Sequence, residues 1–364
     1  MIFDSERMQS LRKRYASIHP CEWPRILWVD QAYPAWKTHL ESLIQTVPPA
    51  VQKDWLQRLV HADDDQHMGA WFEMMLYGWL QQVGQVIVQP HQETSQPDFL
   101  VKTREGDVFV EAFVLRPPRK WQQSRGWKCR LWEVLEEIPR PFLIRIRRAR
   151  CSHAFHQWDE LRSQVINWLD ENPEEPFVWE TADCILRLEA LPWPTSPGTA
   201  SVMDVSEEAI WVDVTPLEKR LRRKYKQHRA VRAQGPFVLA VFFDRWDLAA
   251  GDVVTAWLGS ERWIIDPHTL EVVRQDIDFS GLHYRGKGKP QYTHVSGTLA
   301  FHYGDIQQQP PFLVGRYVQN PFAKHPVDPN LWPVQARFVV VGETGASFKM
   351  KWVHSKGEGD VQGV

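Results

Sequence analysis

Long apolar runs are absent from this chain of 364 residues, since no stretch of about 18 consecutive apolar residues occurs. We therefore expect no transmembrane helix. The first residues also lack the charged start and apolar run of a signal peptide. The four cysteines (Cys21, Cys129, Cys151 and Cys184) are scattered and do not show the paired spacing of a zinc site, which fits a reducing environment. The sequence thus predicts a cytoplasmic protein without a membrane partner.

Several catalytic signatures are missing as well. The chain contains no G-x-S-x-G nucleophile elbow, no Rossmann glycine pattern and no H-E-x-x-H zinc motif. The glycine- and lysine-containing segment 284–290 lacks the spacing of a phosphate-binding P-loop. The missing motifs argue, in that order, against an α/β-hydrolase, a Rossmann dehydrogenase, a zinc metalloprotease and a P-loop nucleoside triphosphatase. Hydrophobic residues at 43% and charged residues at 24% indicate an ordinary folded protein.

The formal net charge is only −2, but the positive charges are unevenly distributed. Segments 116–130, 140–150 and 219–232 contain 19 of the 43 Lys and Arg residues and no acid. Eight cations in segment 219–232 would repel one another on a helix, which favours a polyanion partner over a simple solvated face. Within these segments we expect nucleic-acid phosphate contacts from Arg119, Lys120, Arg145, Arg147, Arg222, Arg223 and Lys226.

A helix and three strands are expected in the first half of the chain. The helix, at residues 68–80, is apolar on nearly every face, which indicates that it is buried. The strands are expected at 86–88, 98–101 and 108–115, and a tight hairpin turn joins the last two. The last strand is apolar on both faces, as in a sheet that is covered on both sides.

Three carboxylates occur in these elements, where a charge is costly. Glu73 is the only charged residue of the helix, Glu111 is the only one of the last strand, and Asp98 opens the strand between them. A buried carboxylate needs a partner, a proton or a cation. If the three converge, their oxygens suit Mg²⁺ or Mn²⁺.

Each carboxylate also has an ordinary interpretation. Asp98 follows Pro97, and Pro-Asp is common in turns. Glu111 could form a buried ion pair with an arginine such as Arg145, and Glu73 could be hydrogen-bonded to the backbone. The three together, in this order, favour the metal site.

Alternating helices and strands continue to residue 243 and predict an α/β fold. A basic helix at 217–232 precedes a fully apolar strand at 236–243, which is expected to be buried on both faces. We expect a helical N-terminal extension at 1–65, a core at 66–245, and an α+β C-terminal extension of unclear role at 246–364.

The arrangement of Glu73, Pro97-Asp98 and Glu111 resembles the PD-(D/E)XK, or restriction-endonuclease-like, nuclease superfamily. The resemblance covers residues 66–245. It implies a mixed central sheet flanked by helices and Mg²⁺- or Mn²⁺-dependent hydrolysis of phosphodiester bonds, in DNA rather than RNA. It further implies Asp98 and Glu111 as metal ligands and Glu73 as an additional ligand or water anchor. Such cores often dimerise to cut two strands, so a homodimer is left open.

The chain departs from the family pattern at the catalytic lysine. The position two residues after Glu111 is Phe113, which shares the strand face where the lysine should lie. Lys224 and Lys219 of the basic helix are the candidates for a relocated catalytic lysine, and we favour Lys224. Lys102 shares the strand face of Asp98 but lies toward the hairpin turn.

Two other functions remain open. The chain could be a nuclease-like module that has lost catalysis and binds nucleic acid or supports assembly, as the missing lysine suggests. It could also be a structural α/β protein in which Glu73 and Glu111 pair with arginines. A lysine at the carboxylates would favour catalysis, and an arginine closed on each of Asp98 and Glu111 would favour the structural protein.

Overall fold

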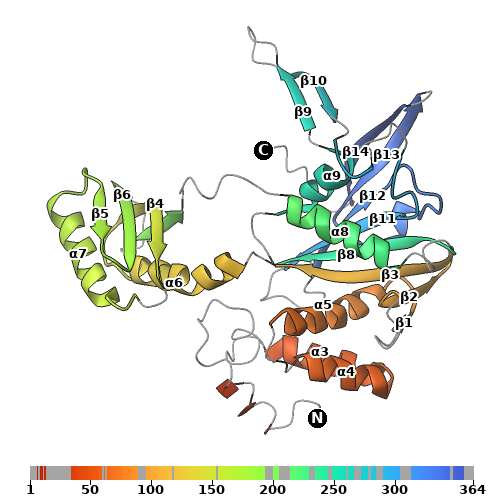
Figure 1. Ribbon diagram of the computed structural model, residues 1–364, viewed down its shortest axis with the longest axis horizontal. Helices are drawn as coiled ribbons and strands as arrows, with labels where there is room; N and C mark the ends of the chain where they lie inside the picture. The colour runs from red at the N-terminus through yellow and green to blue at the C-terminus, as the bar shows by residue number, and fades with distance from the viewer. Residues whose placement is uncertain are drawn as a thin grey trace. The chain divides into compact units, whose positions relative to one another are not determined.

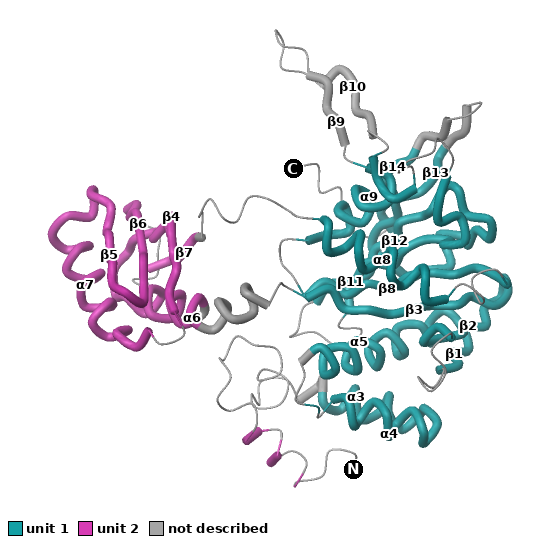
Figure 2. Tube along the Cα trace, in the orientation of Figure 1, with its two compact units in different colours: residues 1–4, 33–116, 213–364 teal, residues 5–32, 117–212 magenta. Residues whose placement is uncertain are grey.

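The computed structural model describes residues 6, 9–10, 12–13, 34–59, 61, 64–88, 96–116, 119–152, 155–192, 200–204, 214–228, 234–244, 248–259, 261–265, 272–277, 280–283, 290–303, 313–344 and 347–355. The chain divides into two compact units (Figure 2). Unit 1 combines Met1–Asp4, Tyr33–Arg116 and Asp213–Val364, and unit 2 combines Ser5–Ala32 and Pro117–Val212. The larger part of unit 2 is therefore inserted between two segments of unit 1.

Unit 1 is built on one mixed sheet of eight strands in the order β1-β2-β3-β8-β11-β12-β13-β14 (Figure 1). The pairs β3–β8, β8–β11 and β12–β13 are parallel, and the other neighbours are antiparallel. The strands are β1 Gln85–Val88, β2 Phe99–Thr103, β3 Gly106–Leu115, β8 Phe237–Phe243, β11 Gly297–Tyr303, β12 Leu313–Gln319, β13 Ala336–Thr344 and β14 Ser347–His354. A separate antiparallel pair is formed by β9 Glu261–Ile265 and β10 Val272–Ile277.

Helices cover both faces of this sheet (Figure 1). Trp71 of α5 contacts Phe242 of β8, with ring centroids 5.1 Å apart. Leu221 of α8 instead belongs to the same buried cluster as Leu239 of β8. Because alternate residues of a strand point to opposite faces, α5 and α8 cover opposite faces of the sheet. The helices of unit 1 are α3 Pro34–Thr46, α4 Pro49–Leu59, α5 Asp64–Leu80, α8 Thr215–Gln227, α9 Ala250–Leu258 and the short 3₁₀ helix η2 Pro329–Leu331.

The helices α3 and α5 approach closely at Gly78, where a larger residue would make the Leu43 side chain shift. A Cβ atom at Gly78 would lie 2.7 Å from Leu43 Cδ2, which is closer than real Cβ contacts. The strand β8, between β3 and β11, has all seven residues buried. The apolar strand expected at 236–243 is therefore present, and the α/β class with a large mixed sheet flanked by helices is confirmed.

Unit 2 has a smaller sheet and a core of its own. The strands lie in the order β5-β6-β4-β7, with β4 and β7 parallel and the other pairs antiparallel. Leu135 of α6 and Val165 of α7 form one buried cluster with Ile144 of β4 and Leu186 of β6. Both helices therefore cover the same sheet face. The elements are α6 Arg119–Glu136, β4 Phe142–Cys151, α7 Trp158–Glu171, β5 Phe177–Glu180, β6 Cys184–Pro192 and β7 Ser201–Asp204.

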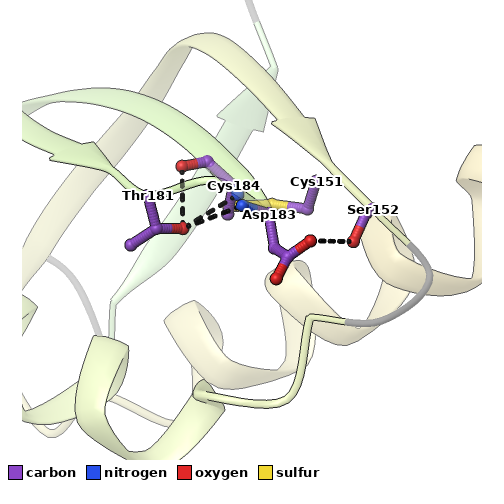
Figure 3. The surroundings of a disulfide bond; sticks show 5 residues. All are labelled: Cys151, Ser152, Thr181, Asp183 and Cys184. Atoms are coloured by element: carbon purple, nitrogen blue, oxygen red, sulfur yellow. Dashed lines mark hydrogen bonds between the residues drawn. A yellow bond between two sulfur atoms is a disulfide. The ribbon is translucent and has the colours of Figure 1, made fainter.

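A disulfide joins Cys151 and Cys184 in unit 2 (Figure 3). The two residues are direct partners in the register of β4 and β6, so the sheet itself brings them together. Beside the bond, the Thr181 hydroxyl accepts a hydrogen bond from the backbone N–H of Cys184 at 3.0 Å. The spacing of the cysteines does not predict this pair, because the residues meet only through the strand register.

These units divide the chain differently from the expected boundaries at 65 and 245. Residues 117–212, expected inside the core, belong to unit 2, and strands β11 to β14, expected in a C-terminal extension, continue the sheet of unit 1. No helix in the described part of the chain is long and apolar enough to cross a membrane. The cytoplasmic location remains a prediction.

Candidate functional site

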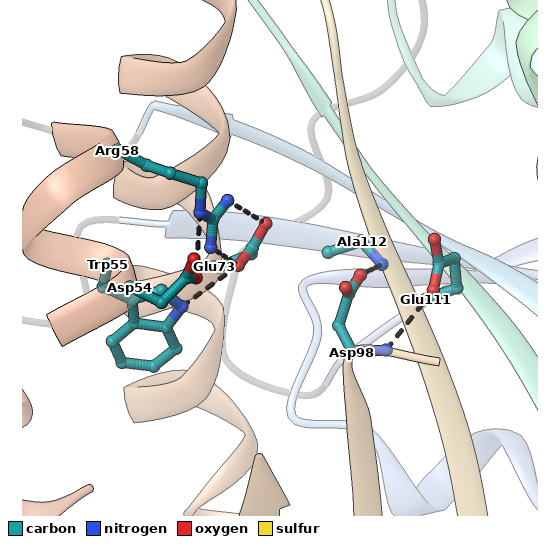
Figure 4. Close-up of polar contacts among 7 residues, drawn as sticks. All are labelled: Asp54, Trp55, Arg58, Glu73, Asp98, Glu111 and Ala112. Carbon is teal, nitrogen blue, oxygen red and sulfur yellow. Dashed lines mark hydrogen bonds and ion pairs between the residues drawn. The ribbon is translucent and has the colours of Figure 1, made fainter. Parts of the chain in front are cut away.

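Asp98 and Glu111 lie side by side on neighbouring strands (Figure 4). The register pairs Phe99 with Val110, which places Asp98 opposite Glu111 at the start of β2. The backbone N–H of Asp98 donates to Glu111 Oε2 at 3.3 Å, and the backbone N–H of Ala112 donates to Asp98 Oδ2 at 2.7 Å. Both residues are buried, with 6% and 2% of their surface exposed. The strand ladder thus fixes two buried carboxylates at one point, and the turn interpretation of Asp98 is incomplete.

Lys224 brings an ammonium group to this point. Its Nζ forms an ion pair with Glu111 Oε1 from α8, the helix above this face of the sheet. Burial opposes the charged form of the lysine, but the charges of Glu111 and Asp98 outweigh burial and raise the pKa of Lys224 above its usual value. The favoured candidate for a relocated lysine therefore reaches the predicted carboxylates, whereas Lys219 is exposed on the same helix.

His228 is a further member of the site that the sequence did not identify. Its Nε2 lies 3.1 Å from Glu111 Oε2, and the residue is only 4% exposed. Burial raises the pKa of the Glu111 carboxyl, but His228 and the charge of Lys224 outweigh burial and hold this pKa below its usual value. The available signal was spacing, because His228 follows Lys224 by four residues and so lies on the same helical face.

Phe113 explains why the lysine comes from a helix. The side chain is 4% exposed and belongs to the buried cluster that includes Leu217 and Leu221 of α8. A lysine at this position would place its charge in an apolar core, which is costly without a partner. The strand position therefore serves helix packing, and the cation beside Glu111 comes from Lys224 of α8.

Glu73 belongs to a different group of contacts (Figure 4). Arg58 of α4 donates to both carboxylate oxygens of Glu73, and Trp55 Nε1 donates to its Oε2 at 3.0 Å. Burial disfavours the charged arginine, but Glu73 and then Asp54 outweigh burial and raise the pKa of Arg58. The structure thus gives Glu73 an arginine partner, as the structural hypothesis expected.

Glu111 differs from Glu73 in the residues that pair with it. Its partners are Lys224, His228 and the backbone of Asp98, and not Arg145, which was the arginine considered for it. The expected pairing of both glutamates with arginines therefore holds for only one of them.

The residues expected to contact nucleic acid lie on α8 of unit 1 and on β4 and α6 of unit 2. Arg222, Arg223 and Lys226 lie on α8, where Arg223 and Lys226 are exposed and Arg222 is half-buried. Arg145 and Arg147 lie on β4 of unit 2. Arg119 and Lys120 start α6, and their side chains lie outside the described residues. The structure leaves the nucleic-acid role of all of them untested.

The oxygens of Asp98 and Glu111 are of the kind that bind a divalent cation, but the described residues form no larger cage around them. Among the described residues, no group of three or more His, Cys, Asp or Glu side chains is arranged to hold a metal ion. Mg²⁺ often binds proteins through one or two carboxylates, with water and substrate phosphates completing its shell. Asp98 and Glu111 supply this minimal set of hard oxygen donors, and Glu73 is engaged by Arg58.

Similarity to known proteins is limited and partial. No protein-family model and no solved structure matches the chain. A stretch of 166 residues, 44% of this chain, is 27% identical to the cytosolic alpha-glucan phosphorylase 2 of Arabidopsis thaliana. The stretch is 17% of the phosphorylase, so the chain spans much less than two-thirds of that relative. This match does not show a family.

Proposed function

We propose that the chain is a Mg²⁺- or Mn²⁺-dependent nuclease of the PD-(D/E)XK type, with DNA as the expected substrate. The single observation that carries the proposal is the contact of Lys224 with Glu111 beside Asp98. A carboxylate pair and a lysine are the groups that the family motif requires, and here they meet although Phe113 occupies the usual lysine position. The order of α5, the β1-β2-β3 meander, α8 and the parallel strand β8 gives further support.

The residues have separate roles in this proposal. Asp98 and Glu111 would hold the divalent ion, which when bound would stabilise negative charge on the phosphate and make an attacking water more acidic. Lys224 places a positive charge beside these carboxylates, where an attacking water or a phosphate oxygen is bound. His228 fixes the Glu111 carboxylate from its other oxygen. Glu73 is held by Arg58 within the helical layer and takes no direct part in this proposal.

A second candidate is a binding module without catalysis. It is favoured by the same contacts, because Lys224 and His228 already satisfy the buried Glu111 without any metal. In this case the carboxylate–lysine pair anchors α8 to the sheet, and the exposed cations of α8 contact nucleic acid.

Cleavage assays on circular and linear, single- and double-stranded DNA with Mg²⁺ or Mn²⁺ test the proposal. Asp98→Asn, Glu111→Gln and Lys224→Met should each lower the rate by about 10²-fold or more. Lys219→Met, on the same helix but exposed, is the matched control and should retain activity. Excess EDTA should abolish cleavage by the wild type.

The outcomes separate the two candidates. Cleavage that persists in the Asp98→Asn and Glu111→Gln variants would sink the nuclease assignment to this site. Salt-sensitive DNA binding without cleavage under any metal condition would favour the binding module. If the chain neither binds nor cleaves DNA, Asp98, Glu111 and Lys224 form only a structural ion-pair network.

A further inference from the structure

One face of the unit 2 sheet carries a concentration of arginines. The strands alternate, so Ile144 and Leu186 point toward α6 and α7, while their strand neighbours point to the other face. That other face, which we call the arginine face, contains five arginines. They are Arg145, Arg147, Arg148 and Arg150 of β4 and Arg187 of β6. All are exposed except Arg145, which is half-buried.

A bulge in β4 increases this concentration. The register with β6 shifts between Ile146 and Arg148, so Arg147 is an extra residue without a register partner. Such a bulge bends a strand and re-aims its side chains. As a result Arg147 and Arg148 are both exposed, and Arg147 Nε lies 2.7 Å from Glu189 Oε2.

Among the described residues, the arginine face carries more positive than negative charge. The acidic residues described there are Glu180 of β5 and Glu189 of β6, so five arginines minus two glutamates leave three positive charges. Arg148 and Arg187 are direct register partners, and like charges at directly opposite positions destabilise a sheet. This unfavourable pairing is relieved when an anion lies across both strands.

The other side chains on this face indicate the kind of anion. Val178 is 58% exposed and Met203 is 44% exposed, and the described residues of this face include no aromatic ring. Aromatic platforms are what proteins use to stack the bases of single strands. Arginines without such platforms suit the phosphate backbone of a duplex, which is contacted independently of sequence.

We propose that the arginine face of unit 2 is a docking surface for the phosphate backbone of duplex nucleic acid. The surface is distinct from the carboxylate–lysine site of unit 1 and does not depend on cleavage. A nuclease would use it to hold substrate, and an inactive module would use it for binding alone. It extends the expected contacts of Arg145 and Arg147 to three further arginines.

The test is the binding of the full chain to a fluorescein-labelled DNA duplex of about 20 base pairs. Fluorescence anisotropy measures this binding in the presence of EDTA. The variant Arg145→Gln/Arg148→Gln/Arg150→Gln should bind at least about 10-fold more weakly. The slope of log K against log salt should fall by about 2 to 3, because each phosphate contact contributes about 0.9. The absence of metal keeps this result separate from any failure of cleavage.

Two control variants make the result specific. Lys53→Gln/Lys324→Gln/Lys351→Gln removes three exposed positive charges from unit 1 and should change the slope much less. Arg145→Lys/Arg148→Lys/Arg150→Lys keeps the charge and should keep most of the slope. The proposal would be overturned if the glutamine variant bound DNA like the unit 1 control. It would also be overturned if the lysine variant bound DNA as weakly as the glutamine variant. Tighter binding of a single strand than of the duplex would also overturn it.

Discussion

Lys224 and Glu111 are 113 residues apart in the chain and yet form a buried ion pair. The Glu111 side chain is 3% exposed and the Lys224 side chain 17%, so water screens the pair weakly. Removing one member leaves the other charge without its main partner. The loss in free energy of unfolding should therefore be larger than for a surface ion pair.

Replacing Lys224 by Met should destabilise unit 1 by about 3 kcal/mol, because the buried Glu111 charge then keeps only His228 and a backbone N–H. Equilibrium unfolding in urea measures this change. The double variant Lys224→Met/Glu111→Gln should recover part of the loss, since neither buried charge remains.

Lys219→Met is the control for the same substitution at an exposed position of α8. We expect its effect to stay within about 0.5 kcal/mol. Equal effects at Lys219 and Lys224 would show that the ion pair contributes little to stability.

His283 gives unit 1 a dependence on pH. Burial lowers the pKa of His283 to about 4 from an ordinary value of 6.5, although a hydrogen bond with the Gln291 carbonyl opposes the shift. The unfolded chain therefore binds more protons between these values. The stabilisation from neutral His283 is complete above about pH 6.5 and is lost as the pH falls through 4. The loss amounts to about 3 kcal/mol.

The variant His283→Asn retains a side-chain N–H donor and should flatten the decline in stability between pH 6.5 and 4. Urea unfolding at a series of pH values measures the slope, which is compared with that of the exposed-site variant His354→Asn. An unchanged slope in His283→Asn would assign the acid sensitivity to other groups.

At the scale of elements, the contact between α4 and α5 depends on a second buried pair. Arg58 and Glu73 have side chains that are 16% and 10% exposed, and Trp55 adds a hydrogen bond from α4 to the same carboxylate. The sequence shows the apolar stripe of α4 through Trp55 and Leu59, which are buried as its spacing predicts. It does not show the pair, because Arg58 and Glu73 belong to different helices.

Replacing Arg58 by Met should lower stability by about 3 kcal/mol, since the buried Glu73 carboxylate then loses its arginine partner. In the double variant Arg58→Met/Glu73→Met both charges are gone, and at least half of this loss should return. Thermal and urea unfolding would test both variants beside Lys53→Met, an exposed change on the same helix. A double variant less stable than the single one would contradict this account.

Element boundaries were predictable where burial is uniform and less so elsewhere. The apolar segment 236–243 gives β8 within one residue, because a strand covered on both faces needs no polar position. Apolar residues at helical spacing begin only at Trp127, whereas the helix α6 itself begins at Arg119. Its first turns are rich in Arg, Lys and Gln, which form helices readily but provide no apolar periodicity to detect.

At the scale of the whole molecule, local patterns did not reveal the insertion. Unit 2 alternates helices and strands just as a continuing α/β core would, and periodicity does not tell which sheet a strand joins. In the same way, no local pattern in residues 297–303 shows that strand β11 is the parallel neighbour of β8. The carboxylate pair was predictable because one hairpin brings Asp98 and Glu111 together, whereas His228 required the placement of α8.

Two units with separate cores should unfold in two steps, and the Cys151–Cys184 disulfide should act on only one of them. The bond closes a segment with a sequence separation of 33, so its loss should destabilise unit 2 by up to about 4 kcal/mol. Calorimetry of the wild type with and without reductant, and of Cys151→Ser/Cys184→Ser, measures this shift. Lys224→Met should move the other transition, which assigns each step to its unit.

The double serine variant also serves as the control for the reductant, which should no longer shift the affected transition once the bond is absent. This pattern requires that stability in unit 2 depends on a covalent link between β4 and β6, whereas stability in unit 1 depends on the buried charges beneath α8. A single cooperative transition that both variants shift equally would show that the two cores unfold as one, and the division into units would then have no thermodynamic counterpart.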